Sequence, residues 1–108
     1  MAGVNMTDFY VRQGSAIKAN FRGANLESAT FHQSDLDGAN FSDASLTGAS
    51  FGSSSLKGAN FRNADLTGAS FGGSDLEGAD MMETDTGSAN FCNTIMPNGD
   101  VNNTGCDK

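Results

Sequence analysis

Few residues of this chain could do chemistry, because the side chains that catalysis needs are scarce. Cys92 and Cys106 are the only cysteines, and His32 is the only histidine. One exposed imidazole far from both thiols cannot complete a Ser-His-Asp or Cys-His arrangement. Two cysteines without a companion histidine cannot close a zinc site. We therefore predict that the protein is not an enzyme and that it holds no metal or cofactor.

The two cysteines allow two interpretations. A disulfide would close a loop of the fifteen residues from Cys92 to Cys106, and such a loop stabilises a fold by about 3 kcal/mol in the chain-entropy account. A structural disulfide would also indicate an oxidising compartment. The alternative is a pair of reduced thiols in a cytoplasmic protein.

Polar residues near the C-terminal end could suggest a calcium loop. Asn98, Asp100 and Asn102 alternate as the first ligands of such a loop do. A calcium loop also needs a glycine at its sixth place and a bidentate glutamate at its twelfth, and the sequence supplies neither. The segment from Pro97 to Asp100 is better explained as a turn stabilised by Asx hydrogen bonds.

The elements that must position these residues follow a five-residue period. A large apolar residue recurs at every fifth position from Phe21 to Leu76, and a small residue, Ala or Ser, stands two positions before each one. This period suits neither a helix, where 500° of rotation would scatter the apolar positions, nor a flat strand, where an odd period alternates faces. A chain that turns a corner every five residues explains it. Such short self-similarity predicts an all-β solenoid.

Phe and Leu alternate strictly, and this alternation predicts the number of sides. Three sides would stack Phe21 on Leu36, whereas four sides stack like on like. Serine replaces alanine at the small position only at 34, 54 and 74, which is again a spacing of twenty. We therefore expect about four coils of twenty residues, and the predicted core columns are Phe21, Phe41, Phe61 and Met81; Phe31, Phe51, Phe71 and Phe91; Leu26, Leu46 and Leu66; and Leu36, Leu56 and Leu76.

The repeated units also resemble a known family. Ala-Asn-Phe-Arg-Gly, Ala-Asp-Leu-Thr-Gly and Ser-Asp-Leu-Glu-Gly are similar to the A(D/N)LXX unit of pentapeptide repeat proteins. The match covers about residues 14–93 and is specific, because about a dozen consecutive units keep one register. The resemblance implies a right-handed, four-sided β-helix.

Both ends depart from the repeat, and we expect both to be caps. Residues 1–13 should cover the first coil, with a helical turn that starts near Thr7, because Phe9 is too large for the small inward position. Residues 94–108 should cover the last coil. The run from Phe91 to Cys106 resembles the extension of cyanobacterial and chloroplast-lumen pentapeptide repeat proteins. That resemblance implies a disulfide between Cys92 and Cys106 and a location in the thylakoid lumen or periplasm.

Composition and charge restrict the partners. Thirteen acidic against six basic residues give a net charge of −7, which argues against direct nucleic-acid binding. An acidic rod could instead mimic DNA and inhibit a topoisomerase of the gyrase type, as some family members do. Four coils rise only about 20 Å, however, the length of about six base pairs, and Arg22, Lys57 and Arg62 interrupt the acidic faces. We favour a non-enzymatic scaffold that binds an unknown protein partner.

Two further expectations concern the molecule as a whole. No apolar run approaches the length of a membrane span or of a signal-peptide core, so we expect no membrane span and the mature form of an exported protein, or a cytoplasmic protein if the cysteines are reduced. The unpaired edge of the last coil invites association. We therefore expect a monomer or a weak end-to-end dimer.

Overall fold

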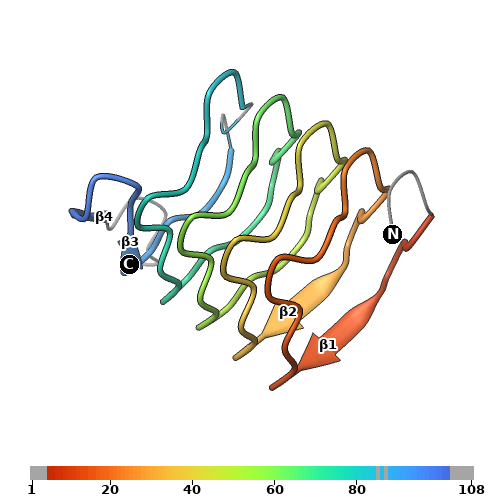
Figure 1. The fold of residues 1–108 in the computed structure, drawn as a ribbon, viewed down its shortest axis with the longest axis horizontal. Helices are drawn as coiled ribbons and strands as arrows, with labels where there is room; N and C mark the ends of the chain where they lie inside the picture. The colour runs from red at the N-terminus through yellow and green to blue at the C-terminus, as the bar shows by residue number, and fades with distance from the viewer. Residues whose placement is uncertain (1–4, 85, 87, 103–108) are drawn as a thin grey trace.

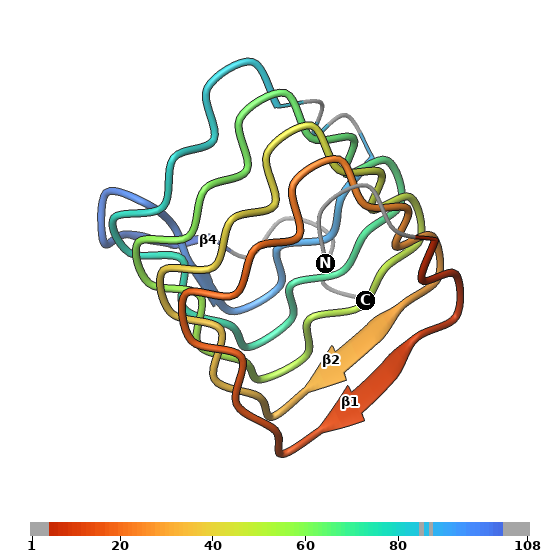
Figure 2. The same ribbon diagram turned by 45° about the vertical axis from the view of Figure 1, so that its right-hand side comes forward.

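The computed structural model describes residues 5–84, 86 and 88–102 and consists of stacked turns of extended chain. Its four short strands are β1 (Tyr10–Arg12), β2 (Thr30–His32), β3 (Thr94–Ile95) and β4 (Val101–Asn102). The strands β1 and β2 pair in parallel at one end of the stack, and β3 and β4 pair antiparallel at the other (Figures 1 and 2). The described part of the chain contains no helix that is long and apolar enough to cross a membrane.

Parallel bridges between successive turns confirm the predicted spacing of twenty. Asn20 pairs with Asn40 and Asn40 with Asn60, and every other isolated bridge also joins residues twenty apart, from Asn5 with Asn25 to Asp75 with Ile95. Backbone hydrogen bonds follow the same register, as between the Phe41 N–H and the Asn60 carbonyl oxygen at 2.7 Å. Each turn of the chain therefore hydrogen-bonds to the next turn in the same register.

The corners between pentapeptides explain the polar and glycine positions. The Ala24 N–H donates to the Phe21 carbonyl oxygen at 3.0 Å, and Gly23 between them has φ +68°. A four-residue turn with positive φ at its third residue is a type II turn, which favours glycine or asparagine there. Most corners repeat this conformation, with a glycine or with residues such as Asp43, Ser53 and Asn63.

Where the residue before the large apolar residue is Asn or Asp, its side chain stabilises the same corner. Asn40 Oδ1 accepts the Ser42 N–H at 2.9 Å, and Asn60 Oδ1 accepts the Arg62 N–H at 2.9 Å. This is the Asx turn, which explains why Asn and Asp favour this position. Equivalent bonds to the N–H two residues later are made by Asn5, Asn20, Asn25, Asp35, Asp65, Asp75, Asp80 and Asn90.

Two columns of phenylalanine rings fill one half of the interior. Phe21, Phe41 and Phe61 are nearly parallel, with ring centroids 5.0 and 5.1 Å apart. The second column stacks in the same way at 5.0–5.5 Å and comprises Phe31, Phe51, Phe71 and Phe91. Rings of the two columns meet edge to face at 5.6–6.1 Å, an arrangement that the aromatic quadrupole favours.

The leucine positions are all fully buried and complete the core. They are Leu26, Leu46, Leu66, Leu36, Leu56 and Leu76. The buried serines at the small position have a structural role, since the Ser54 hydroxyl donates to the Phe31 carbonyl oxygen at 2.7 Å and accepts the Ser34 N–H at 3.1 Å. Ser74 bonds Phe51 and Ser54 equivalently. This buried ladder explains why serine recurs every twenty residues.

The N-terminal segment differs from the expectation. The helical turn near Thr7 was a wrong prediction, because residues 5–13 follow the coil register and include β1. Met6 is buried at the position equivalent to Leu26, and Phe9 occupies the small position with its ring centroid 5.9 Å from that of Phe31. The small position therefore accepts Phe9. Residues 1–4 of the predicted cap lie outside the described residues.

The C-terminal segment continues the register before it turns back. Ile95 bridges to Asp75, and the Thr94 hydroxyl donates to the Phe71 carbonyl oxygen at 2.7 Å. The predicted turn is confirmed: Gly99 has φ +90°, its N–H donates to the Met96 carbonyl oxygen at 2.8 Å, and β4 then pairs with β3. Cys106, with the rest of 103–108, lies outside the described residues, so the disulfide stays a prediction.

Candidate interaction surface

The residues that could do chemistry lie apart from one another. His32 is half-buried in β2, and its ring covers Gly52, where an added Cβ would come within 2.9 Å of His32 Cδ2. Cys92 stands two positions before β3, the strand that lies at the opposite end of the stack from β1 (Figure 1). Within the described residues, no group of three or more His, Cys, Asp or Glu side chains could hold a metal ion.

The possible calcium ligands belong to the turn between β3 and β4. The Asp100 N–H donates to Asn98 Oδ1 at 3.0 Å, and Asn98 Nδ2 donates to Asp100 Oδ2 at 3.1 Å. These bonds confirm the Asx turn. The third residue of the set, Asn102, lies in β4.

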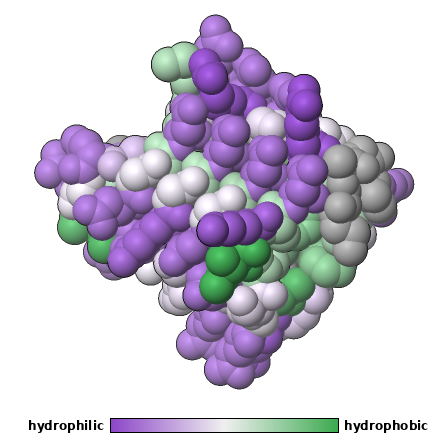
Figure 3. Space-filling view, viewed as in Figure 1, coloured by the Kyte–Doolittle hydropathy of each residue, from purple (hydrophilic) through white to green (hydrophobic). Residues whose placement is uncertain are grey.

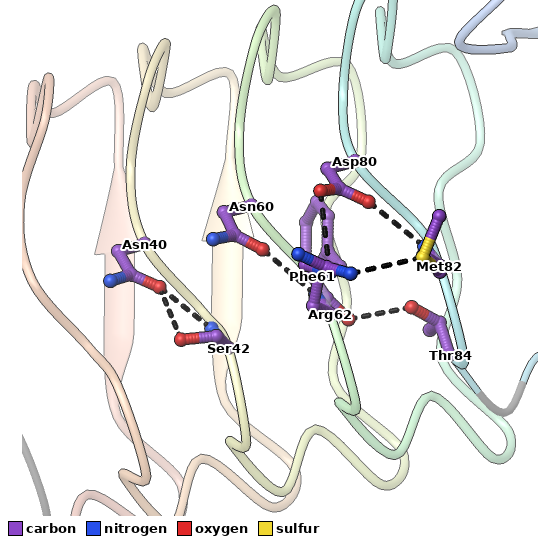
Figure 4. Close-up of polar contacts among 8 residues, drawn as sticks. All are labelled: Asn40, Ser42, Asn60, Phe61, Arg62, Asp80, Met82 and Thr84. Carbon is purple, nitrogen blue, oxygen red and sulfur yellow. Dashed lines mark hydrogen bonds and ion pairs between the residues drawn. The ribbon is translucent and has the colours of Figure 1, made fainter.

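One outward surface combines polar, charged and apolar side chains. We call it the Arg62 face, and its members are Asn40, Ser42, Asn60, Arg62, Asp80 and Met82 (Figure 4). They occupy equivalent positions of three successive turns, because Asn40, Asn60 and Asp80 are joined by parallel bridges. The backbone register therefore places their side chains in adjacent rows.

Arg62 connects two turns on this face. Its Nη2 donates to Met82 Sδ at 3.0 Å, and its Nε lies 3.6 Å from Asp80 Oδ2. The Arg62 side chain is 47% exposed and Met82 is 57% exposed. An exposed ion pair of this kind adds about 1 kcal/mol or less to stability. The cluster is therefore a surface feature and contributes little to holding the fold together.

The face rests on a fixed backbone. The Asp80 Oδ1 accepts the Met82 N–H at 3.0 Å, and the Thr84 hydroxyl donates to the Phe61 carbonyl oxygen at 2.6 Å (Figure 4). Phe61 itself is fully buried in the aromatic column. The turns that present Arg62 and Met82 are thus held from both sides, by an Asx turn outside and by the core inside.

Many acidic side chains outside this face are also engaged. Asp43 pairs with Arg22 at 3.3 Å, and Asp37 Oδ1 accepts the Ser55 hydroxyl and the Lys57 N–H. At Asp65, hydrogen bonds from the Thr67 hydroxyl and the Thr67 N–H hold the pKa below its ordinary value. These carboxylates stabilise corners and neighbouring turns. The acidic composition therefore has a local structural explanation.

A comparison with known proteins identifies the family of the chain. A profile described as "Pentapeptide repeat region" matches residues 12–81. The chain belongs to the pentapeptide repeat family. No curated protein sequence matches it. Among solved structures, a pentapeptide repeat protein from the thylakoid lumen of Arabidopsis thaliana is 31% identical with a TM-score of 0.83, over 86% of this chain and 65% of the other.

Two more distant structures share the fold. A pentapeptide repeat protein from the cyanobacterium Cyanothece 51142 is 22% identical with a TM-score of 0.58, over 81% of this chain and 80% of the other. QnrB1, a plasmid-mediated fluoroquinolone resistance protein, is 22% identical with a TM-score of 0.54, over 95% of this chain and 56% of the other. This chain covers less than two thirds of the length of the Arabidopsis protein and of QnrB1.

Exposed apolar side chains are scattered over the surface of the pentapeptide repeat protein. Most of the face shown in Figure 3 is hydrophilic, with separate hydrophobic areas. The large exposed apolar residues within the described part are Tyr10, Ile17, Met82 and Val101. Met82 was missed by sequence reasoning, although its outward position held a signal. The equivalent positions 22, 42 and 62 are Arg, Ser and Arg.

A pocket at the β3–β4 end of the stack was also missed. Its volume is about 490 Å³, and its lining residues are Met81, Thr84, Thr86, Ala89, Phe91, Met96, Pro97 and Asn102. Met81 and Ala89 are only partly buried, unlike their counterparts in earlier turns. Thr84 and Thr86 are the sequence signal, because they interrupt the alanine and leucine positions.

Proposed function

We propose that this pentapeptide repeat protein is a non-enzymatic scaffold that binds a protein partner through the Arg62 face. Its framework would be a right-handed, four-sided β-helix of about four coils, with residues 14–93 as the repeat domain. The twenty-residue bridges and the family membership support this architecture. A stacked framework keeps outward side chains in fixed rows, which suits recognition of another surface.

The observation that carries the proposal is the exposed contact between Met82 and Arg62. Methionine and arginine are enriched at the cores of protein interfaces, and lysine and glutamate are depleted there. Arg62 presents an apolar stem and a guanidinium beside the Met82 thioether, and Asp80 pairs with the same guanidinium. A partner could cover Met82 and pair with Arg62 without rearranging the backbone.

The proposed compartment is the thylakoid lumen or a periplasm. The likeness to the Arabidopsis lumenal protein, at 31% identity, supports the lumen. In this proposal residues 1–13 cover the first coil, residues 94–108 form the C-terminal cap, and a disulfide between Cys92 and Cys106 holds that cap. The molecule would be a monomer or a weak end-to-end dimer.

The second candidate is a DNA-mimicking inhibitor of a gyrase-type topoisomerase. The fold shared with a fluoroquinolone resistance protein and the net charge of −7 favour it. Against it, Asp43, Asp75 and Asp80 are each paired with a base, so the acidic rows are partly neutralised. In a gyrase supercoiling assay we expect no inhibition at micromolar protein. Potent, salt-sensitive inhibition would instead establish this second candidate.

Affinity capture from lumen or periplasm extract tests the scaffold proposal. Three baits are compared: the unmodified protein, the double variant Arg62→Ala with Met82→Ser, and Ser53→Asn as the matched control. Asn tolerates the positive φ of 54° at position 53, so the control keeps its corner. We expect a protein retained by the first and third baits and lost from the second. Equal retention by all three would refute the Arg62 face as the interface.

A further inference from the structure

The pocket near β3 arises where the regular core changes. Leu26, Leu46 and Leu66 are fully buried in successive turns, and the equivalent residue of the next turn is Thr86. Threonine is smaller than leucine, and Thr86 is only partly buried. The volume that another leucine would fill therefore contributes to the pocket of about 490 Å³.

The chemical character of the lining is mainly apolar. Met81, Ala89, Phe91, Met96 and Pro97 form the apolar walls, and none of the lining residues in the described part of the chain is charged. A charged ligand would lose its hydration without finding an opposite charge, which is costly. Small-molecule pockets commonly have 300–1,000 Å³ and a few polar groups among apolar walls. The pocket thus suits an uncharged, compact ligand.

Two threonines line the pocket, and they differ in what their hydroxyls do. The Thr84 hydroxyl donates to the Phe61 carbonyl oxygen at 2.6 Å. No hydrogen bond joins the Thr86 hydroxyl to any residue in the described part of the chain. The Thr86 hydroxyl can therefore donate a hydrogen bond to a ligand oxygen, whereas the Thr84 hydroxyl already donates to the backbone.

The end of the aromatic column indicates which shape of ligand would fit the pocket. Phe91 is the last ring of its column, stacked on Phe71 at 5.5 Å and an angle of 7°. It also lines the pocket. An aromatic ring placed on the pocket side of Phe91 would continue the stacking seen throughout the column, at a spacing that aromatic pairs favour.

We propose that this pocket is a binding site for an uncharged aromatic ligand with one hydrogen-bond-accepting oxygen. The ring would stack on Phe91 between Met81 and Met96, and the oxygen would accept a hydrogen bond from the Thr86 hydroxyl. The site is separate from the Arg62 face, so the proposal does not depend on the scaffold function. It assigns a ligand-binding role to the end of the stack.

Methionine-methyl NMR tests this proposal directly. The protein is labelled with ¹³C at the methionine methyl groups and titrated with acetophenone, an uncharged aromatic ketone. We expect saturable shifts at Met81 and Met96, which line the pocket, and no shift at Met6 or Met82, which do not. Equal shifts at all four methyl groups, or none at Met81 and Met96, would overturn the assignment.

Two substitutions at Thr86 test separately the pocket volume and the hydrogen bond from the Thr86 hydroxyl. Thr86→Leu should restore the leucine column and weaken acetophenone binding at least tenfold. Thr86→Val keeps the shape without the hydroxyl, so acetophenone should bind about fivefold more weakly while ethylbenzene is unaffected. Unweakened binding by the Leu variant would refute the pocket. Equal effects of Val on both compounds would refute the hydrogen bond.

If Thr86→Leu perturbs the fold, Ala89→Leu offers a second way to fill the pocket from another wall. An unchanged Met6 methyl signal would show that the distant core is intact. Under that condition, the Ala89 variant should also weaken acetophenone binding at least tenfold. Undiminished binding would overturn the proposal.

Discussion

Replacing Gly58 with alanine tests the corner geometry that recurs every five residues. Gly58 has φ +68°, and an added Cβ would meet no atom within 4 Å. The substitution therefore changes backbone strain without creating a clash. Forcing an L-residue into the left-handed region costs about 1–2 kcal/mol, and alanine recovers about 0.4–1 kcal/mol by restricting the unfolded chain. We expect a net loss of about 1 kcal/mol in the free energy of unfolding.

Gly72 provides the matched control, because it is a corner glycine without positive φ. An added Cβ there would lie 3.8 Å from the Cys92 carbonyl oxygen, an ordinary contact. Gly72→Ala should therefore stabilise the protein by about 0.4–1 kcal/mol through the unfolded state. Urea denaturation followed by circular dichroism gives both free energies. Equal effects of the two alanines, or stabilisation by Gly58→Ala, would refute the corner geometry.

Four other substitutions test the core, the cap and the pH dependence. Phe61→Ala should cost about 3–5 kcal/mol in urea melts. Phe91→Ala should cost less because, among the described residues, Phe61 contacts the rings of Phe41, Phe51 and Phe71, whereas Phe91 contacts that of Phe71 alone; equal losses would contradict the columns. Cys92→Ser should expose the C-terminal segment to proteases while the circular dichroism of the β-helix persists, and two free thiols in the native protein by mass spectrometry would exclude the disulfide. Because its bonds from Thr67 lower the Asp65 pKa, this carboxylate stabilises the fold above its unfolded pKa of about 3.9, and that contribution should be lost as the pH falls through the folded pKa. Thr67→Ala should raise the Asp65 pKa in an NMR titration, and an unchanged pKa would refute the assigned cause.

The twenty-residue spacing was predictable because two independent features share it. Alternation of Phe and Leu requires an even number of corners, and the serines at 34, 54 and 74 recur at the full period. The structure adds the reason for the serines, whose hydroxyls bond the backbone of the adjacent turn. Because the repeat is strict, the order of residues along the sequence was enough to predict which residues stack in successive turns.

The first turn was harder to predict because large and small residues exchange places. Phe9 stands at a small position, and Val11 stands where the column otherwise has phenylalanine. The smaller Val11 offsets part of the volume of Phe9, and Gly14 leaves room for it, since a Cβ there would come within 2.5 Å of Val11 Cγ1. Residue-by-residue size rules miss such compensation, because packing depends on the summed volume of a layer.

The Arg62–Met82 contact and the pocket could not be derived from the period alone. Both depend on departures from the repeat in its last described turn, at Met82, Thr84 and Thr86. The sequence shows that these residues are unusual. Which atoms they contact depends on side-chain rotamers and on the volume left by neighbours.

Site-specific photo-crosslinking tests the central claim, that the Arg62 face binds a protein partner. A photo-reactive phenylalanine analogue replaces Met82 in one sample and Ser53 in another, and both are irradiated in lumen or periplasm extract. Position 82 lies beside Arg62, whereas position 53 belongs to a corner in another row of turns. We expect one defined crosslinked product from position 82 and none from position 53. No product from position 82, or the same products from both positions, would contradict the claim.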